Sequence, residues 1–336
     1  MCEKRGAFHY RATEKTRKGA QSFALKTVEY KLGEKYAERG CALALGFFDG
    51  VHKGHRELLA KTVAEARKRG VFSAVFTFRY GGGLKGGRNM IYSEREREEL
   101  LSSLGIDVCF IADFSELKNM TPEDFVKKTV VGDIGAAFAS VGYNYRFGRG
   151  GEGDARKLSE LMRQEGAEAF IFDAYTEGGE PVSSTRVRSS LESGRIEEAN
   201  SMLGVPYFIS GTVEHGRGDG KRFGFPTVNT AVEEGRVRLK SGVYLTAVKI
   251  GEKLYTGLTN AGECPSFGKR SYHAETFLLD FSDDVYGMEI KVYFLSFLRE
   301  ERVFSSAGEL ALQIEKDRAV ARERMKNIKW QEIGLA

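Results

Sequence analysis

Two histidines, His52 and His55, share the stretch LALGFFDGVHKGH, which runs from Leu43 to His55. Apolar residues recur at helical spacing from Gly54 to Arg69, so the histidines lie where a helix is predicted to begin. The first turn of a helix aims free backbone N–H groups and the positive end of its dipole at the preceding segment. We therefore expect this stretch to bind a nucleoside triphosphate, with the two imidazoles flanking the anion.

The residues before the histidines are predicted to form a strand and a tight turn. The apolar run from Ala42 to Phe48 fits a buried strand, and Gly46 and Gly50 permit a tightly turned backbone. The expected phosphate-binding positions of this turn are Gly46, Phe48, Gly50 and Gly54. Because H-x-G-H is a short pattern, two ordinary surface histidines at a helix start are the alternative interpretation.

A second polar cluster, SSTRVR, runs from Ser183 to Arg188 and precedes a segment of helical pattern. Its hydroxyl and guanidinium groups suit the binding of a phosphate that is being transferred. The candidate contacts are Ser184, Thr185 and Arg188. A plain N-cap at Ser183 or Ser184 is the alternative interpretation of the same residues.

Strands and helices alternate in the first part of the chain, which must position these residues. Further strands are predicted at 71–78, 108–112, 137–141 and 168–172, and further helices at 93–104, 121–131 and 154–165. Such alternation favours a Rossmann-like α/β domain with a parallel sheet. Five glycines between Arg79 and Asn89 indicate a loop, and Phe23 to Val28 is a candidate extra strand.

The pattern changes near 203–206. Short alternating strands are predicted at 208–214, 242–250, 253–259, 273–281 and 289–297, which favours an antiparallel β-barrel. A final helix at about 306–326 carries Leu310, Ile314, Asp317 and Ala321 near one face and is expected to cover the barrel. The 336 residues are thus divided into an N-terminal segment (1–40), a first domain (41–203) and a second domain (204–336).

Composition narrows the class of protein. A formal charge of +4, spread evenly, suits phosphate-rich small molecules and does not call for nucleic acid. Charged residues make up 29% of the chain, and no apolar stretch in the sequence is long enough for a membrane helix or a secretory signal. The four cysteines stand apart without a C-x-x-C pair, which favours neither disulfides nor zinc and indicates a reducing cytoplasm. Oligomeric state is not indicated.

Several motifs, in order, resemble the bacterial bifunctional riboflavin kinase/FAD synthetase family. Three segments resemble the adenylyltransferase half of that family: GFFDGVHKGH (46–55), VGYNYRFGRGGEGD (141–154) and SSTRVRSSLESGRIEEANSMLGVPY (183–207). Four segments resemble the kinase half: GTVEHGRGDGKRFGFPTVN (211–229), GVY (242–244), AETFLLDF (274–281) and FSSAGELALQIEKDRAVAR (304–322). Agreement of ordered motifs across two domains is more specific than any one of them.

The resemblance implies a riboflavin kinase site in the second domain. Glu275 matches the base that takes the proton from the ribityl 5'-hydroxyl, and Asn260 lies in the flavin-side loop. Thr227 and Asn229, two residues apart on an extended segment, face the same way and offer oxygen atoms to Mg²⁺. The Gly-rich segment is expected to bind the ATP phosphates through Gly216, Gly218 and Lys221.

The resemblance also implies that the phosphate of FMN attacks the α-phosphorus of ATP, giving FAD and pyrophosphate without a covalent enzyme intermediate. His52 and His55 would stabilise the charge of the transition state. Asn144 and Arg146 match a family motif and are expected to contact flavin or phosphate. The leaving phosphates would be held by Ser184, Thr185 and Arg188.

Two segments depart from the family pattern. Family members commonly carry a segment close to F-x-P-H-P after the second strand, whereas Phe78 here is followed by RYGGGLKGG. The flavin-side loop has N-A-G at 260–262 and P-S-F at 265–267, in place of N-I-G and P-T-F. A riboflavin kinase with a degenerate first domain, and a flavin- or nucleotide-binding regulator without turnover, are therefore the open alternatives.

Overall fold

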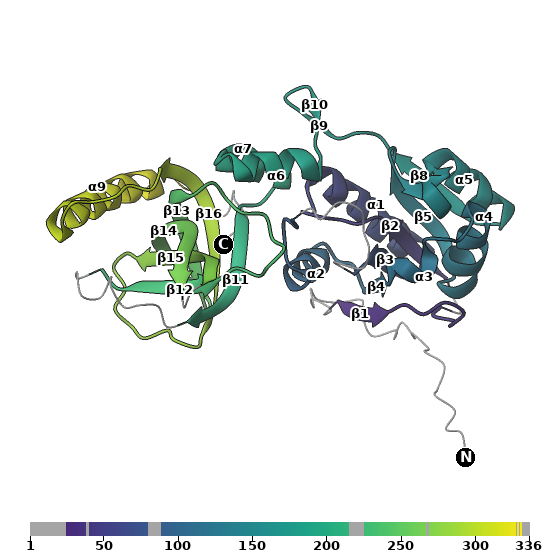
Figure 1. Cartoon of the computed structure of the whole chain (residues 1–336). Helices are drawn as coiled ribbons and strands as arrows, with labels where there is room; N and C mark the ends of the chain where they lie inside the picture. Colours follow the sequence, from purple (N-terminus) through teal and green to yellow (C-terminus); the bar gives the residue numbers. More distant parts are fainter. Residues whose placement is uncertain are drawn as a thin grey trace, which may run out of the picture. The chain divides into compact units, whose positions relative to one another are not determined.

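The structure is a computed structural model that describes residues 25–37, 40–79, 89–214, 225–266, 269–326, 328 and 330, except for the side chains at 264–266 and 269–271 (Figure 1). These residues form two compact units. The first contains the described residues up to 79 together with Glu94–Val182, and the second contains 89–93 and the described residues from Ser183 onward. Most of the predicted N-terminal segment and the glycine loop at 80–88 lie outside the described residues.

A parallel sheet forms the centre of the first unit. In spatial order its strands are β1 (Lys26–Glu29), β4 (Val108–Ala112), β3 (Phe72–Phe78), β2 (Cys41–Leu45), β5 (Ala136–Gly142) and β8 (Glu168–Phe172). Strands β2 and β4 are buried along their whole length, as apolar runs covered on both faces should be. Every neighbouring pair in this sheet is parallel, which confirms the predicted α/β fold.

Helices and short hairpins connect these strands. The helices are α1 (Lys53–Arg69), α2 (Glu94–Ser103), α3 (Phe114–Leu117), α4 (Pro122–Asp124), the 3₁₀ turn η2 (Arg149–Gly151) and α5 (Ala155–Gln164). The hairpins pair β6 (Arg146–Phe147) with β7 (Gly153–Asp154) and β9 (Thr176–Glu177) with β10 (Glu180–Pro181). Short segments of this kind have no periodicity from which they could be predicted.

The helix predicted at 121–131 is present, and most of it is a π-helix. Thr121 does begin a helix, since its hydroxyl accepts the Asp124 N–H at 3.1 Å, but the chain continues as the π-helix η1 (Phe125–Asp133). The hydroxyl of Tyr30 lies 3.0 Å from Thr129 Oγ1 and 2.8 Å from Asp133 Oδ2, so this wider helix packs against the segment after β1. Apolar spacing of three to four residues suits either helix, and the tertiary contact decides between them.

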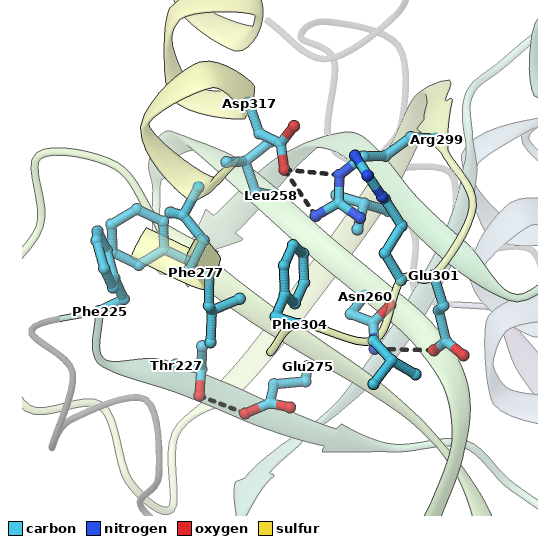
Figure 2. A pocket seen from close by; sticks show the side chains of 15 residues that line it. Phe225, Thr227, Leu258, Asn260, Glu275, Phe277, Arg299, Glu301, Phe304 and Asp317 are labelled. Carbon is cyan, nitrogen blue, oxygen red and sulfur yellow. Dashed lines mark hydrogen bonds and ion pairs between the residues drawn. The ribbon is translucent and has the colours of Figure 1, made fainter. Parts of the chain in front are cut away.

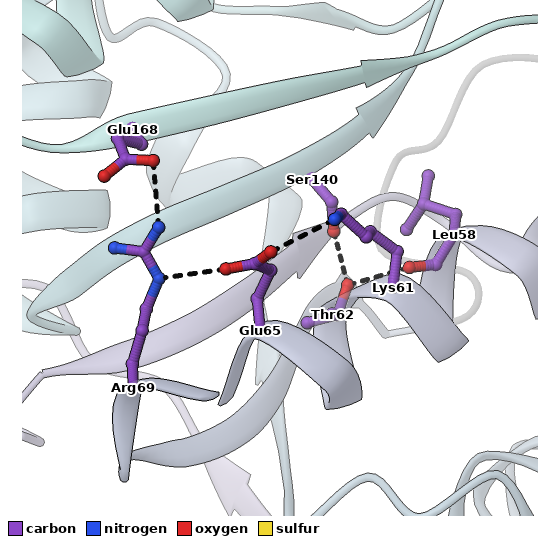
Figure 3. Close-up of polar contacts among 7 residues, drawn as sticks. All are labelled: Leu58, Lys61, Thr62, Glu65, Arg69, Ser140 and Glu168. Atoms are coloured by element: carbon purple, nitrogen blue, oxygen red, sulfur yellow. Dashed lines mark hydrogen bonds and ion pairs between the residues drawn. The ribbon is translucent and has the colours of Figure 1, made fainter. Parts of the chain in front are cut away.

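Helix α1 is fixed against the sheet by its middle turns (Figure 3). The hydroxyl of Thr62 donates to the Leu58 carbonyl at 2.9 Å and forms a short hydrogen bond with the hydroxyl of Ser140 on β5. The helix ends at Gly70, whose φ of +66° allows the left-handed cap that donates back to the last turn. The C-terminal end of α1 is therefore defined by a local contact.

A chain of charges joins the outer edge of α1 to β8 (Figure 3). Glu65 accepts hydrogen bonds from Lys61 (3.0 Å) and Arg69 (3.3 Å), and Arg69 also donates to Glu168 on β8 (2.9 Å). The Lys61 bond, followed by that from Arg69, lowers the pKa of Glu65. These contacts tie the C-terminal half of α1 to the first residue of β8.

A closed antiparallel barrel forms the second unit and confirms the predicted change of architecture. Its strands run in the order β11 (Tyr207–Glu214), β12 (Thr227–Ala231), β15 (Lys269–Leu278), β14 (Lys253–Ser266), β13 (Gly242–Ile250) and β16 (Glu289–Arg299). Helix α9 (Ala307–Lys326) buries Ala321 against Val243, Leu245 and Leu258 of the outer barrel face. The predicted covering helix is thus present.

Alternation along the strands separates an inner from an outer barrel face. Thr246, Thr259 and Thr276 are fully buried and form a hydrogen-bonded row of hydroxyls, with oxygen distances of 2.8 and 2.9 Å. Because successive strand residues point to opposite faces, Leu258 and Asn260 are on the outer face, on the side of α9. That face carries the cavity described below.

Helices α6 (Ser184–Glu192) and α7 (Ile196–Leu203) are grouped with the barrel. The backbone N–H of Lys240 donates to the Leu191 carbonyl at 3.2 Å, and Asn200 Nδ2 donates to the Phe294 carbonyl at 2.8 Å. Residues 89–93 join the same unit, since the Met90 N–H donates to the Gly235 carbonyl at 2.6 Å. The compact units therefore divide the chain earlier than the predicted boundary after Leu203.

Candidate functional sites

The loop between β2 and α1 is buried and has an unusual backbone. Phe48 and Val51 have φ of +53° and +42°, in the left-handed region that residues with a Cβ rarely adopt. Gly50, at φ +82°, enters the same region freely, and Gly46 lies so near the Phe48 ring that a Cβ there would be 3.0 Å from it. A left-handed non-glycine residue costs about 1–3 kcal/mol, so surrounding contacts must hold this loop.

The loop delivers His52 and His55 as a stacked pair. His52 is the N-cap of α1, and its Nδ1 accepts the backbone N–H of His55 at 3.4 Å. The two rings lie 3.7 Å apart between centroids at an angle of 17°, and the edge of Phe48 packs on His55 at 5.2 Å. Gly54 passes close by, where a Cβ would be 3.3 Å from Tyr175. The structure therefore brings the two predicted histidines together.

Burial keeps both imidazoles neutral at pH 7. It lowers the pKa of His52 to about 4, and burial together with the charge of a protonated His52 lowers the pKa of His55 well below its usual value. Since His52 Nδ1 is an acceptor, the proton of neutral His52 belongs on Nε2. His55 Nδ1 is buried and has no hydrogen-bond partner among the described residues. The pair thus offers uncharged N–H donors to an anion.

The segment after β5 lies at the same edge of the sheet as this histidine loop. Strands β2 and β5 are adjacent and parallel, so the loops that follow them leave from neighbouring carboxyl ends. The direction of chain progress across the sheet reverses between these strands, which is where open α/β sheets bind ligands. Asn144, in the loop after β5, and Arg146, at the start of β6, are both exposed. The topology therefore brings them to the edge that carries the histidines.

The first turn of α6 contains the second predicted cluster. Ser183 is the N-cap, because its hydroxyl accepts the Arg186 N–H at 3.3 Å. Thr185 is exposed, and Arg188 Nη2 donates to its hydroxyl at 3.5 Å. Ser184 precedes them at the helix start, so the three candidate side chains share one helix end. The alternative interpretation holds for Ser183, whose hydroxyl caps the helix.

A cavity of about 510 Å³ lies on the outer face of the barrel beside α9 (Figure 2). Its apolar lining consists of Phe225, Val243, Leu258, Phe277, Val303, Phe304, Leu310 and Ile314. Its polar lining consists of Thr227, Asn260, Glu275, Arg299, Glu301, Arg302 and Asp317. Apolar walls with a few convergent polar groups are typical of a site for a small organic molecule.

Three neighbouring strands place the predicted kinase residues in one row. Asn229 on β12 and Asn260 on β14 both lie opposite Glu275 on β15. Residues directly opposite one another on adjacent strands share a face, so the carboxylate has an amide on each side. Thr227 Oγ1 donates to Glu275 Oε1 at 2.6 Å (Figure 2). The structure thus brings all four residues together.

Asn260 is also tied to the loop that follows β16. Its Nδ2 donates to Glu301 Oε1 at 3.1 Å (Figure 2). Its Oδ1 is buried and has no hydrogen-bond partner among the described residues. A buried acceptor of this kind in a cavity wall calls for a donor from a ligand or a water. Asn260 therefore meets the geometric requirement for a residue that binds a polar edge of a ligand.

Sequence reasoning missed the ion pair that closes one side of this cavity. Arg299 Nε and Nη2 donate to Asp317 Oδ2 at 2.9 and 2.8 Å (Figure 2). Gln313 Nε2 also donates to Asp317 Oδ1, at 2.9 Å. The guanidinium also lies over the ring of Phe304, 5.9 Å from its centroid. Asp317 lies on the predicted apolar face of α9, which indicated that it would be buried and paired with a cation. The sequence pattern did not indicate that the partner is Arg299.

The described residues contain no cluster of three or more His, Cys, Asp or Glu side chains that could hold a metal ion. The oxygen donors beside Glu275 are instead a hydroxyl and an amide. The remaining phosphate-binding predictions, Gly216, Gly218 and Lys221, lie outside the described residues.

Both halves of the chain match known families. The family described as FAD synthetase matches residues 34–186, and the family described as riboflavin kinase matches residues 203–325. The bifunctional riboflavin kinase/FMN adenylyltransferase of Escherichia coli (strain K12) is 34% identical over 294 residues, covering 85% of this chain and 93% of the relative. The chain belongs to the bifunctional riboflavin kinase/FMN adenylyltransferase family. The Bacillus subtilis (strain 168) member is 30% identical over 296 residues, with 85% and 93% covered.

Membership in the bifunctional riboflavin kinase/FMN adenylyltransferase family confirms the predicted resemblance and the presence of both enzymatic domains. A crystal structure described as a macrolide-efflux protein from Streptococcus pneumoniae has a TM-score of 0.79 and 26% identity, covering 91% of this chain and all of that one. That description concerns the other protein alone. In the part of this chain that the structure describes, no helix has the length and apolar character needed to cross a membrane.

Proposed function

We propose that this chain phosphorylates riboflavin with ATP to give FMN and then joins FMN to the adenylyl group of a second ATP, giving FAD and pyrophosphate. The observation that carries the kinase step is the row Asn229, Glu275 and Asn260, of which Glu275 and Asn260 line an apolar cavity. The observation that supports the adenylyl step is the stacked histidine pair at the edge of the parallel sheet, with His52 buried and His55 half-buried.

In the kinase step, Glu275 is proposed to accept the proton of the ribityl 5'-hydroxyl. The 5'-oxygen then forms a bond to the γ-phosphorus of ATP while the bond from that phosphorus to the ADP oxygen breaks. One carboxylate oxygen is already held by Thr227 at 2.6 Å, which leaves the other to face the substrate. The flavin ring is proposed to occupy the apolar cavity, with Asn260 at its polar edge. Gly216, Gly218 and Lys221 are proposed to bind the ATP phosphates.

Magnesium fits the donors that the barrel presents. Thr227 and Asn229 alternate on β12, so their oxygens share the face of Glu275. A hydroxyl and an amide are hard oxygen donors, and Mg²⁺ in kinases takes most of its other ligands from phosphates and water. We therefore assign Thr227 and Asn229 as the protein ligands of the ion. When bound, it would neutralise charge on the transferring phosphate.

In the adenylyl step, a phosphate oxygen of FMN is proposed to form a bond to the α-phosphorus of ATP while the bond to pyrophosphate breaks. His52 and His55 would donate hydrogen bonds to the α-phosphate as its charge develops. An approaching triphosphate raises the pKa of a neighbouring imidazole, so the pair can also take up a proton when ATP binds. Ser184, Thr185 and Arg188 are proposed to hold the leaving phosphates, and Asn144 and Arg146 the flavin side.

The domain limits remain a proposal: an adenylyltransferase domain at 41–203 and a kinase domain at 204–336, preceded by a segment of unassigned role. We further propose that the protein binds flavin as substrate and product and works in the cytoplasm. The buried free thiols of Cys41 and Cys109 suit a reducing compartment. Its partners are proposed to be small molecules, namely riboflavin, FMN and ATP.

A timed incubation of purified protein with riboflavin and Mg-ATP tests the whole proposal. Chromatography should resolve riboflavin, FMN and FAD, with FMN rising first and FAD following. The glycine-rich sequence after Phe78 motivates the alternative of a kinase alone. FMN that accumulates without FAD, even when a pyrophosphatase removes pyrophosphate, would select that alternative. Flavin binding without consumption of ATP would select the non-catalytic regulator.

A further inference from the structure

Helix α2 carries an arginine, Arg97, that is fully buried. Charged side chains are almost never fully buried unless they are paired or hydrogen-bonded. Arg97 Nη1 donates to the Phe47 carbonyl at 3.1 Å and to Thr77 Oγ1 at 3.3 Å, and its Nη2 points to the Phe78 carbonyl at 3.5 Å. Its guanidinium also lies over the Phe47 ring, 5.7 Å from the centroid. The contacts gather at the end of β3 and on the histidine loop.

The Phe47 carbonyl receives a second donor from the same place. Thr77, which is also fully buried, donates its hydroxyl to this carbonyl at 3.2 Å. One backbone oxygen is therefore held by a hydroxyl and a guanidinium, and these two groups are bonded to each other. A planar guanidinium can serve several acceptors in fixed directions, which an ammonium group on a flexible stem cannot do.

That carbonyl belongs to the peptide bond that leads into the strained part of the loop. Phe48, the next residue, has φ of +53°, and Val51 has φ of +42°. Strained backbone of this kind persists only where its surroundings determine it. The ring of Phe48 packs on His55, so a change at Phe48 would move the imidazole pair as well.

We infer that Arg97 and Thr77 are positioning residues for adenylyl transfer. They fix the Phe47 carbonyl and thereby hold the left-handed loop in the conformation that stacks His52 on His55. This inference rests on the proposed assignment of the two histidines to the adenylyl step. Neither residue is proposed to contact ATP or FMN. Their loss should therefore lower the rate of the chemical step more than the affinity for either substrate.

The test compares three variants in the full-length protein. Thr77→Val removes one hydroxyl at nearly constant volume. Arg97→Lys keeps the positive charge with fewer directed donors, and Arg97→Met removes both the charge and the donors. The matched control is Ser73→Ala at the opposite end of β3, where the buried hydroxyl bonds to the Gly105 carbonyl (3.1 Å) and Asp107 (2.8 Å). Conversion of supplied FMN to FAD and phosphorylation of riboflavin are measured on each preparation, together with the thermal midpoint.

We expect kcat for FAD formation to fall about fivefold in Thr77→Val, about tenfold in Arg97→Lys and about a hundredfold in Arg97→Met, because a misplacement near 1 Å can cost a factor of a hundred. KM for ATP should change less than threefold, and riboflavin phosphorylation and the Ser73→Ala variant should keep wild-type rates. Should Arg97→Met fail to fold, Thr77→Val and Arg97→Lys decide the matter.

Wild-type kcat for FAD formation in both conservative variants would overturn the inference. So would an equal loss in Ser73→Ala, or a parallel loss of both activities, since either points to general destabilisation. A His52→Ala variant distinguishes an error in the positioning role of Arg97 and Thr77 from an error in the assignment of the histidines to the adenylyl step. If His52→Ala makes FAD at the wild-type rate, the histidine assignment is wrong; if it loses activity while the two conservative variants do not, only the positioning role is wrong.

Discussion

The two candidate sites of this enzyme are held by different kinds of structure. In the barrel, Glu275 is flanked by Asn229 and Asn260 on adjacent strands, so the hydrogen-bond ladder itself sets their spacing. In the first unit, His52 and His55 are set by a loop with two left-handed residues that carry a Cβ. A ladder repeats one stable geometry, whereas a strained loop depends on the contacts around it. The adenylyl step should therefore be the more sensitive to distant changes.

The sites also differ in how charge is used. Glu275, the proposed proton acceptor of the kinase step, lies in the cavity wall beside a hydroxyl and two amides. The histidines are neutral, with His52 buried and His55 half-buried, which suits donation of hydrogen bonds to a charge that the substrate brings. One chain is thus proposed to carry a proton acceptor in a cavity and a pair of hydrogen-bond donors at a sheet edge, and each can be removed without the other.

We expect Glu275→Gln to produce the largest difference between the two activities. This change keeps the size of the side chain but removes the proposed proton acceptor, so kcat for riboflavin phosphorylation should fall about 10²- to 10⁴-fold. FAD formation from supplied FMN should stay at the wild-type rate. Glu263→Gln on β14 is the control, because Glu263 is exposed and pairs with Arg238 at 2.8 Å on the surface. If the Glu275→Gln enzyme still makes FMN at more than a tenth of the wild-type rate, Glu275 is not the base.

We expect His52→Asn to have the opposite effect, with FAD formation lost and riboflavin phosphorylation kept. Asparagine is a good N-cap, so α1 keeps its start while the imidazole is lost. Removal of one donor to a developing charge typically costs 10²- to 10³-fold, and we expect about a hundredfold loss of kcat for FAD formation from FMN. Riboflavin phosphorylation, measured on the same preparation, shows that the chain is folded. Equal loss of both activities would contradict the separation of the two sites.

The architecture could be predicted from the sequence because both units follow simple patterns. Apolar runs such as Cys41–Leu45 are buried on both faces of a parallel sheet, and this pattern is visible without a structure. Strands β4, β8 and β13 begin and end where the pattern predicted. The π-helix η1 was missed, because its hydrogen bonds depend on packing against Tyr30 and not on local spacing.

The site residues could be predicted where they form short motifs, and not where they act from a distance. His52 with His55, and Thr227 with Asn229, are neighbours in the sequence and in space. Arg97 lies fifty residues from the carbonyl that it holds, and its surroundings in the sequence, EREREELL, are typical of a solvated helix. Its spacing from Leu100 and Leu101 places it on the buried face of the helix, but only the fold shows which acceptors it reaches.

The burial of the histidines predicts a pH dependence of stability in the first unit. Unfolded His52 takes up a proton with its ordinary pKa of 6.5, whereas the folded residue does so only near 4. Between these values the unfolded state binds more protons, so stability is lost as the pH falls from about 6.5 towards 4. His52 alone should cost roughly 2 kcal/mol by pH 5, and His55 adds in the same direction.

Hydrogen exchange of the α1 amides measures this local stability, because it reports the opening of one helix without requiring the whole chain to unfold. After correction for intrinsic exchange rates, protection should fall between pH 7 and pH 5 in the wild type. His52→Asn should show a smaller fall, while amides of β13 in the barrel should show the same behaviour in both proteins. Identical pH profiles for α1 in the two proteins would mean that His52 titrates normally.

The smallest effect is expected at the ion pair beside the kinase cavity. Asp317→Asn weakens the bonds from Arg299, which tie α9 to the end of β16. Helix α9 also supplies Leu310 and Ile314 to the cavity wall, so a loosened helix should bind riboflavin less well. Because this contact serves the ground state and the transition state alike, KM for riboflavin should rise about tenfold with kcat changed less than threefold.

The control for this prediction is Glu323→Gln on the same helix, where Glu323 pairs with Lys326 on the exposed surface. An exposed pair contributes little, so this variant should keep the wild-type KM. FAD formation from FMN should be unchanged in both variants. If Asp317→Asn lowers kcat instead of raising KM, the pair acts on the transferring phosphate. The cavity of the second unit would then depend on distant positioning contacts as the histidine loop does, and the contrast between the two sites would be lost.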